Sequence, residues 1–138
     1  MTPMSAPVEL LKRVPLFARL DDRELKTLAA TFTERSFREG DTLTTEGQGA
    51  AGFFVIESGD ANVTVDGEQR GTLGPGDYYG EIALLDGGAR TATIIATTDG
   101  KSYGLTSWQF RPLVEEHSSI AWPMLEALAA RIRQIDSR

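Results

Sequence analysis

Apolar residues recur at helical spacing in the first quarter of the chain. Leu25, Leu28 and Phe32 are three and four residues apart and would share one face of a helix. The segment before them contains Asp21 and, three residues later, Glu24, the spacing of a capping box. We therefore predict a helix that begins after Asp21 and buries its apolar face.

The C-terminal part predicts two more helices. The first would be capped by Ser107 and run to about Glu116. The second would begin near Ser118 or Ser119, with Pro123 in its first turn, where a missing N–H costs least. Steps of four and three residues in this second helix define an apolar seam that would pack in the core or at an interface: Ala121, Leu125, Leu128, Ile132 and Ile135.

The middle of the chain has the pattern of short strands. Residues 53–57 are mostly apolar, and in residues 61–65 apolar and polar side chains alternate before the hairpin signal Asp66-Gly67. Residues 91–96 and 101–106 predict further strands, and all fourteen glycines lie between Gly40 and Gly104. Seven or eight short strands with frequent turns indicate a barrel or roll, so the helix–strand–helix order predicts one α+β domain.

Composition excludes several classes of protein. The 138 residues contain no cysteine and one histidine, His117, which argues against disulfide scaffolds, cysteine-ligated metals and multi-histidine metal sites. The formal net charge of −6 argues against a general nucleic-acid or anionic-membrane surface. No apolar run approaches the roughly 20 residues of a membrane span, and no signal peptide is evident, so we expect a cytoplasmic location without membrane or nucleic-acid partners.

Charge is distributed unevenly. Between Gly40 and Gly104, acidic residues outnumber basic ones by ten to three, which gives this region a net charge of −7. Arg70 and Lys101 follow predicted turns, where surface roles are sufficient. Arg90 differs, because it closes the segment from Gly80 and opens a strand of small, apolar and hydroxyl residues. An ion pair with Glu81 or Asp86 is one explanation for Arg90.

A second explanation is an anion site. Residues 82–85 can form one helical turn, whose first N–H groups lack partners within the helix and favour an anion. Gly87-Gly88 can reverse the chain and bring Arg90 back over the same place, where its guanidinium is suited to bind phosphate. Glu81 can accept hydrogen bonds from ribose hydroxyls. Together these groups match a sugar-phosphate.

The sequence Gly-Glu-Ile-Ala-Leu-Leu (80–85), followed by Arg-Thr-Ala-Thr (90–93), resembles the phosphate-binding cassette of cyclic nucleotide-binding domains. Residues 15–17, 40–41, 46–47, 55–59 and 73–77 are similar to the N-terminal helical motif and the turns of that family. The resemblance implies one domain over residues 1–138. It would comprise N-terminal helices within about 8–34, an eight-stranded β-roll over 35–106 with the cassette at 80–92, and two C-terminal helices over 107–136.

The resemblance also implies roles for the first and last cassette residues. Arg90 would pair with the cyclic phosphate, and Glu81 would accept a hydrogen bond from the ribose 2′-OH. Gly80 would allow close approach of the backbone. Cyclic-GMP-selective members also have a hydroxyl at the position of Thr91, but so do some cyclic AMP binders.

Other residues would complete the ligand site. Backbone N–H groups near Ile82, Ala83 and Ala92 would surround the phosphate, and Thr91 would face the base or the phosphate. Trp122 could cap the base, since family members often use an apolar residue of the last helix in this way. The ligand would be cyclic AMP or cyclic GMP, with no other cofactor and no metal.

The predicted function is therefore that of a regulatory domain that binds a cyclic nucleotide, with cyclic AMP favoured over cyclic GMP, and couples occupancy to movement of the C-terminal helix. The alternative is a degenerate domain of the same fold that acts as a nucleotide-independent dimerisation module. Glu81 and Asp86 could form a catalytic carboxylate pair, but no nucleophile with a nearby base supports an enzyme. A homodimer through the C-terminal helix and an effector outside this chain are the further partners expected. The two helices predicted after residue 106 leave no room for a helix-turn-helix unit within these residues.

Overall fold

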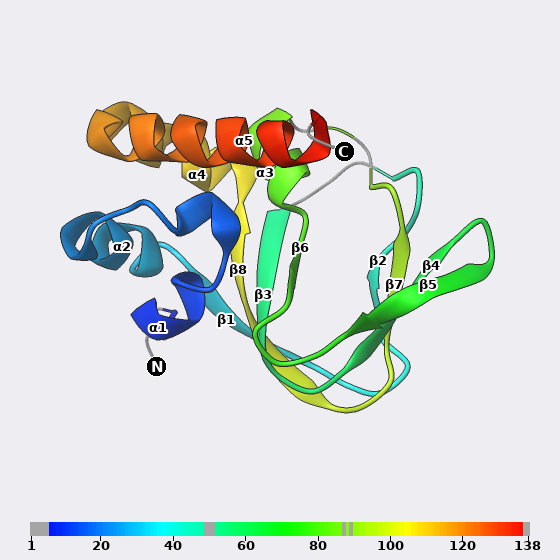
Figure 1. Ribbon diagram of the computed structural model, residues 1–138. Helices are drawn as coiled ribbons and strands as arrows, with labels where there is room; N and C mark the ends of the chain where they lie inside the picture. Colours follow the sequence, from blue (N-terminus) through cyan, green and yellow to red (C-terminus); the bar gives the residue numbers. More distant parts are fainter. Residues whose placement is uncertain (1–5, 49–51, 87, 89, 137–138) are drawn as a thin grey trace.

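Two four-stranded antiparallel sheets form the body of the molecule in a computed structural model that describes residues 6–48, 52–86, 88 and 90–136 (Figure 1). One sheet has the order β1-β8-β3-β6 and the other the order β2-β7-β4-β5. This arrangement confirms the predicted eight-stranded roll, and in the described part of the chain the two sheets do not close into one barrel. The strands are β1 (Thr33–Phe37), β2 (Thr42–Thr44), β3 (Gly52–Ser58), β4 (Ala61–Val65), β5 (Glu68–Leu73), β6 (Tyr78–Tyr79), β7 (Thr93–Ala96) and β8 (Gly100–Thr106).

The β4–β5 hairpin follows from local turn chemistry. Its two turn residues, Asp66 and Gly67, have φ angles of 52° and 81°, which the tight two-residue turns of hairpins require and which glycine and aspartate tolerate. The hairpin extends away from the rest of the roll (Figure 1). The predicted turn and the strand before it are confirmed at the expected residues.

The two faces of strand β3 belong to different cores. Phe53 and Val55 lie in the hydrophobic cluster shared with the N-terminal helices, and Phe17 packs edge-on against Phe53 with ring centroids 5.5 Å apart. Because side chains alternate along a strand, Phe54 and Ile56 point to the opposite face, toward the interior of the roll. The helices therefore cover the outside of the first sheet and leave its inner face to the roll.

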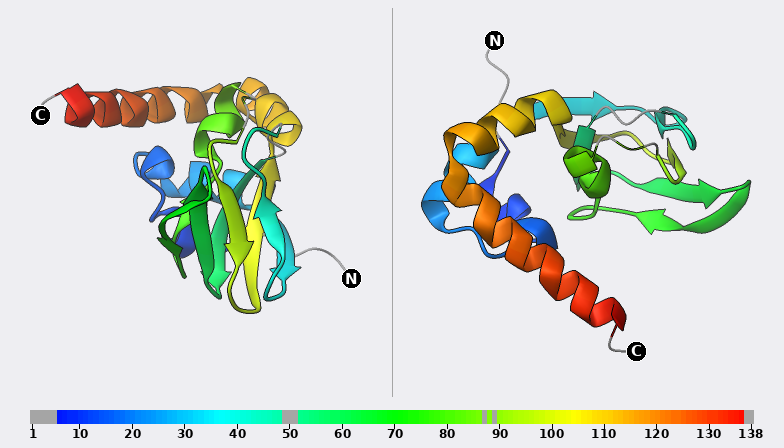
Figure 2. Two further views of the ribbon diagram at one scale, coloured as in Figure 1. Left: turned by 90° about the vertical axis from the view of Figure 1, so that its right-hand side faces the viewer. Right: turned by 90° about the horizontal axis from the view of Figure 1, so that it is seen from above.

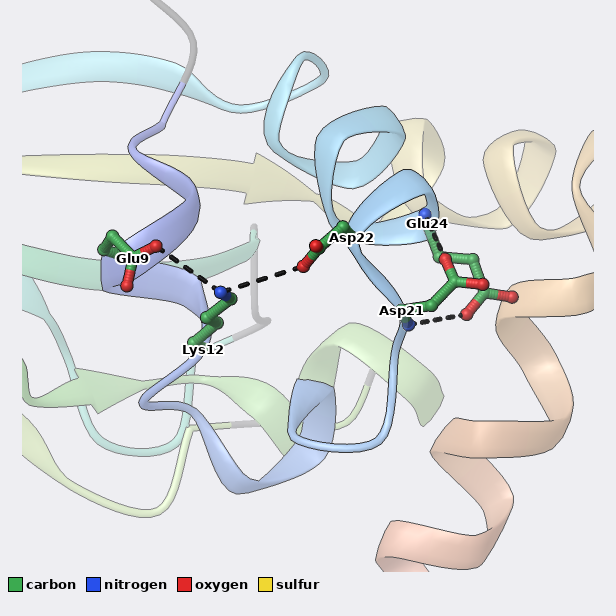
Figure 3. A network of polar contacts seen from close by, with 5 residues as sticks. All are labelled: Glu9, Lys12, Asp21, Asp22 and Glu24. Carbon is green, nitrogen blue, oxygen red and sulfur yellow. Dashed lines mark hydrogen bonds and ion pairs between the residues drawn. The ribbon is translucent and has the colours of Figure 1, made fainter.

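The N-terminal helices are held by the predicted capping box (Figure 3). The Asp21 carboxylate accepts a hydrogen bond from the Glu24 N–H at 2.8 Å, and the Glu24 carboxylate accepts one from the Asp21 N–H at 3.0 Å. Lys12 lies 3.4 Å from Glu9 and 3.7 Å from Asp22, so it links the first two α-helices, although exposed ion pairs add little stability. These elements are α1 (Val8–Leu11), η1 (Pro15–Phe17) and α2 (Asp22–Ala29).

Helix α4 begins one residue earlier than the predicted cap implies. The cap of α4 is Thr106, not Ser107: the Thr106 hydroxyl accepts from the Gln109 N–H at 3.3 Å, and the Gln109 side chain accepts from the Thr106 N–H at 3.1 Å. Thr106 ends strand β8 with an extended backbone, which suits the residue before a helix. The elements after β6 that are not strands are α3 (Glu81–Asp86), α4 (Ser107–Glu116), η2 (Ser118–Ile120) and α5 (Ala121–Asp136).

The predicted seam of α5 is largely exposed. The exposed fractions of Leu125, Ile132 and Ile135 are 54%, 58% and 57%. The residues that α5 buries are instead Met124 and Ala127, which lie on the side of the helix that meets η1. From above, α5 crosses the N-terminal helices and its end extends beyond them (Figure 2). None of the helices in the described part of the chain combines the length and hydropathy needed to cross a bilayer.

Candidate functional site

A cavity of about 590 Å³ opens between the two sheets, beside the start of α3. Its apolar wall comes mainly from the strands of the second sheet, and its polar groups come from the segments before and after α3. The apolar residues are Val63, Leu73, Ala92 and Ile94. The remaining lining residues are Thr44, Asp77, Tyr78, Tyr79, Gly80, Asp86, Gly88, Arg90 and Thr91.

Arg90 and Gly80 meet at the edge of this cavity. The Arg90 guanidinium donates a hydrogen bond from Nη2 to the Gly52 carbonyl of β3. Its Nη1 atom lies against Gly80, so close that a Cβ added to Gly80 would collide with it and with the Gly52 carbonyl oxygen. Gly80 has a φ of 89°, a conformation that glycine adopts without strain. The structure thus brings Arg90 back to the residue that precedes α3, as the sequence predicted for the chain path.

The backbone of Arg90 is fixed as firmly as its side chain. Its N–H donates to the Gln48 carbonyl at 2.9 Å, and its carbonyl accepts from the Gly47 N–H at 2.9 Å. Residues 47 and 48 follow β2 in the second sheet, whereas Gly52 begins β3 in the first sheet. Arg90 therefore connects the two sheets at the place where the cavity opens.

The two described carboxylates of the cavity are engaged by turns. Asp77 accepts a hydrogen bond from the Gly74 N–H at 2.8 Å, and Asp86 accepts one from the Gly88 N–H at 2.8 Å. Among the described lining residues, Arg90 is the single basic side chain. No group of three or more metal-binding side chains occurs in the described part of the chain. This arrangement favours an anion beside Arg90 over paired-carboxylate chemistry.

The predicted single turn is a helix of six residues, α3. Its Leu84 N–H donates to the Gly80 carbonyl at 3.0 Å, so the N–H groups before it have no partner within the helix. Leu84 is 3% exposed and anchors α3 to the main core. Glu81, Ile82 and Ala83 lie in this helix, but their side chains are outside the described ones, so the predicted role of Glu81 toward ribose stays a prediction.

The other predicted site residues lie in different environments. Thr91 is exposed and Ala92 half-buried, and both line the cavity. The Ala92 carbonyl accepts a hydrogen bond from the Thr44 hydroxyl at 3.0 Å, which ties this segment to β2. Trp122 is 68% exposed on α5 and is not among the described residues that line the cavity. Its predicted role as a cap over the base would require α5 to take another position.

Sequence reasoning missed Tyr79. Its ring stacks on that of Phe54 at a centroid distance of 5.3 Å and an angle of 26°. Burial raises the pKa of the Tyr79 phenol to about 12, although the nearby charges of Arg90 and Arg35 act to lower it. A two-residue strand carries no periodic signal. By contrast, the alternation of apolar and polar residues in 61–65 could have predicted that the Val63 side chain faces the interior of the roll, where it lines the cavity.

Comparison with known proteins places residues 34–117 in a family described as "Cyclic nucleotide-binding domain". Over 90 residues the chain is 41% identical to the cAMP-dependent protein kinase regulatory subunit of Yarrowia lipolytica, which covers 64% of this chain and 24% of that protein. It is 28% identical over 130 residues to the cGMP-dependent protein kinase of Plasmodium berghei, covering 94% of this chain and 14% of the kinase. The chain thus spans about a quarter or less of these two relatives.

Among solved structures, the fold matches the N-terminal domain of a transcriptional regulator from Streptomyces coelicolor A3(2). The TM-score is 0.86 at 32% sequence identity, and the alignment covers 93% of each chain. The match extends over nearly all of this chain, so the terminal helices and the roll both have counterparts in that domain.

Proposed function

The chain belongs to the cyclic nucleotide-binding domain family, and from this premise we propose that it binds cyclic AMP, more tightly than cyclic GMP, in the cavity between its two sheets. Domains of this family are regulatory rather than catalytic. One observation carries the proposal: the guanidinium of Arg90 lies against Gly80 at the start of α3, where the first N–H groups have no partner within the helix and favour an anion.

The cavity can take the two halves of such a ligand at different places. The cyclic phosphate would lie by Arg90, whose charge stands out in a region of net charge −7. The apolar side chains of Val63, Leu73 and Ile94 supply a wall for the purine and the ribose. A small ligand bound this way would be recognised by the positive charge of Arg90 and by the fit of its apolar part against the cavity wall.

The preference for cyclic AMP rests on two observations. The relative from Yarrowia lipolytica, named for cyclic AMP, is 41% identical over 90 residues, and the one from Plasmodium berghei, named for cyclic GMP, is 28% identical over 130 residues. Thr91 is the described cassette side chain with a hydroxyl that could favour guanine. A guanine-specific site would need more polar contacts to the base edge.

A short structural route supports coupling of the site to the C-terminal helices. Arg90 is bound to the carbonyl of Gly52, and Gly52 is paired across the sheet with Thr106. Packing here is tight, because a Cβ on Gly52 would lie 2.6 Å from the Leu105 carbonyl oxygen. Thr106 caps α4, which leads through η2 into α5. A shift of Arg90 toward a phosphate would therefore act on the strand pair from which α4 begins.

Calorimetric titration with cyclic AMP and with cyclic GMP tests the binding proposal. Arg90→Leu should weaken cyclic AMP binding by about 2–5 kcal/mol, because the buried phosphate would lose its charge partner. Arg70→Leu is the matched control, since Arg70 is exposed on β5 and paired with Glu68. Near-native affinity in a folded Arg90→Leu protein would remove the assigned role of Arg90. If the wild-type protein binds neither nucleotide, it acts as a nucleotide-independent module instead.

Hydrogen exchange with and without cyclic AMP tests the coupling proposal. The amides of residues 125–132 should change protection when nucleotide binds, because α5 would be repositioned. The amides of β1 (Thr33–Phe37), which contributes none of the described residues that line the cavity, provide an internal reference. Equal protection of residues 125–132 in both conditions would show that α5 is a fixed part of the core.

A further inference from the structure

Tyr79 occupies a part of the site that the cassette pattern does not assign. It is the second of the two residues of β6 and immediately precedes Gly80. Tyr78 packs on the helix side of the sheet, where its ring lies 6.0 Å from that of Phe53. Both tyrosines are among the residues that line the cavity, but because neighbouring side chains of a strand point to opposite faces, it is the Tyr79 side chain that points into the roll.

The orientation of the Tyr79 ring is fixed by its neighbours. Phe54 lies opposite Tyr79 in the β3–β6 pairing, and their rings are stacked. The Phe54 ring in turn packs against Gly104 of β8, where an added Cβ would lie 2.7 Å from the ring atom Cδ1. Because the Phe54 ring is held between Gly104 and Tyr79, the Tyr79 ring has little freedom to turn away from the cavity.

Strand register places Tyr79 in the neighbourhood of Arg90. The acceptor of Arg90 is Gly52, two residues before Phe54 on the same face of β3, a separation of roughly 7 Å along the strand. The Tyr79 ring stacks on that of Phe54, and Nη1 of Arg90 lies against Gly80, the residue that follows Tyr79, so Tyr79 and the guanidinium lie at the same end of the β3–β6 pair. Arg35 adds a second positive charge nearby, since its guanidinium carbon lies 5.9 Å from the centre of the Phe54 ring.

The Tyr79 hydroxyl is suited to donate a hydrogen bond to an anion. Among the described residues it has no hydrogen-bond partner, whereas the hydroxyl of Tyr103 donates to Glu57 Oε2 at 3.3 Å. A pKa of about 12 keeps the Tyr79 phenol protonated at neutral pH, so it remains a donor. Two guanidinium charges near the same ring attract an anion to this position.

We propose that Tyr79 is a ligand-binding residue of this site, and that its hydroxyl donates a hydrogen bond to an exocyclic oxygen of the phosphate held by Arg90. The inference rests on the proposed function, because it assigns one further contact to the same ligand. The two residues would have different roles: the Arg90 guanidinium supplies positive charge to the whole phosphate, whereas the Tyr79 hydroxyl binds only one of its two exocyclic oxygens.

The test compares Tyr79→Phe with Tyr103→Phe, which removes a phenolic hydroxyl from another strand of the same sheet. Each protein is titrated with cyclic AMP and with the two diastereomers of its phosphorothioate, in which sulfur replaces one or the other exocyclic oxygen. Tyr79→Phe should weaken cyclic AMP binding by on the order of tenfold or more, the value of a hydrogen bond to a charged group. The loss should largely vanish for one diastereomer, because sulfur is a poor acceptor, and Tyr103→Phe should bind all three ligands as the wild type does.

Three results decide the outcome. Equal cyclic AMP affinity in the wild type and Tyr79→Phe overturns the role of Tyr79 while the proposed function stands. An equal loss with both diastereomers also overturns it, since the hydroxyl would then act through the structure of the site. If the wild type binds no cyclic nucleotide, the proposed function itself fails and takes this inference with it. A measurement on the wild type alone adds a check independent of variant folding: with tyrosine labelled with ¹³C at Cζ, cyclic AMP should shift the Tyr79 resonance and leave that of Tyr103 in place.

Discussion

Gly80→Ala should damage both stability and nucleotide binding, and the structure separates the two effects. The φ of 89° at Gly80 makes any residue with a Cβ strained there, by roughly 1–2 kcal/mol. The added Cβ would also collide with the Gly52 carbonyl oxygen and with Nη1 of Arg90, and would lie 3.2 Å from the Arg90 Cζ atom. The Gly52 carbonyl belongs to an inner strand and resists displacement, which costs stability, whereas the arginine side chain can be pushed aside, which costs nucleotide affinity.

Gly40→Ala is a matched control for the backbone strain. Gly40 has the same φ of 89°, but a Cβ there would meet nothing within 4 Å. Urea denaturation should therefore show that Gly80→Ala lowers the free energy of unfolding by about 1–3 kcal/mol more than Gly40→Ala does, the usual cost of overpacking. Calorimetry should show that Gly40→Ala binds cyclic AMP normally, whereas Gly80→Ala loses at least about 2 kcal/mol of binding free energy through displacement of Arg90.

The reasoning fails if the two alanine variants behave alike. Equal stability would mean that β3 and Arg90 absorb the methyl group without cost. Equal nucleotide affinity, in a Gly80→Ala protein that is folded, would mean that the position of the Arg90 guanidinium seen in the structure is not the one that binds phosphate.

Two further outcomes follow from the capping box of α4 and from the buried phenol. Urea denaturation should show that Thr106→Ala lowers the free energy of unfolding by about 1 kcal/mol and that Ser107→Ala lowers it by clearly less. A larger effect of Ser107→Ala would show that Ser107 caps the helix. Burial raises the folded pKa of Tyr79 from 10.0 to about 12, so its contribution to stability is fully present below pH 10 and is lost as the pH rises toward 12. Across this interval the wild type should lose on the order of 2 kcal/mol more stability than Tyr79→Phe, and parallel pH profiles of the two proteins would contradict the burial.

The sequence predicted best where a few adjacent residues determine structure. The capping box of Asp21 and Glu24 and the turn at Asp66 and Gly67 use contacts within four residues, and both are present. The cap of α4 was displaced by one residue because Thr106 and Ser107 both carry a hydroxyl. The choice depends on where strand β8 ends, which is set by its pairing with distant strands.

The sequence predicted less well where packing chooses between alternatives. Apolar residues lie on more than one face of α5, so periodicity alone could not tell that Met124 would be buried and Leu125 exposed. That choice depends on how α5 meets η1. Tyr79 was missed for a related reason: its partner Phe54 is 25 positions earlier in the sequence, and only the β3–β6 register brings the two rings and Arg90 together.

The shape of α5 has a mechanical consequence. The helix has 16 residues and is about 24 Å long, and its buried contacts, Met124 and Ala127, lie in its first half. It is thus a lever that is held near one end. A rotation of about 10° at the held end would displace the other end by about 4 Å, so small adjustments near Thr106 would be amplified along the helix. A distance measured between two labels would therefore change most when one label is placed near Ile135. A partner that binds the exposed end of α5 would contact the part of the helix that is displaced most.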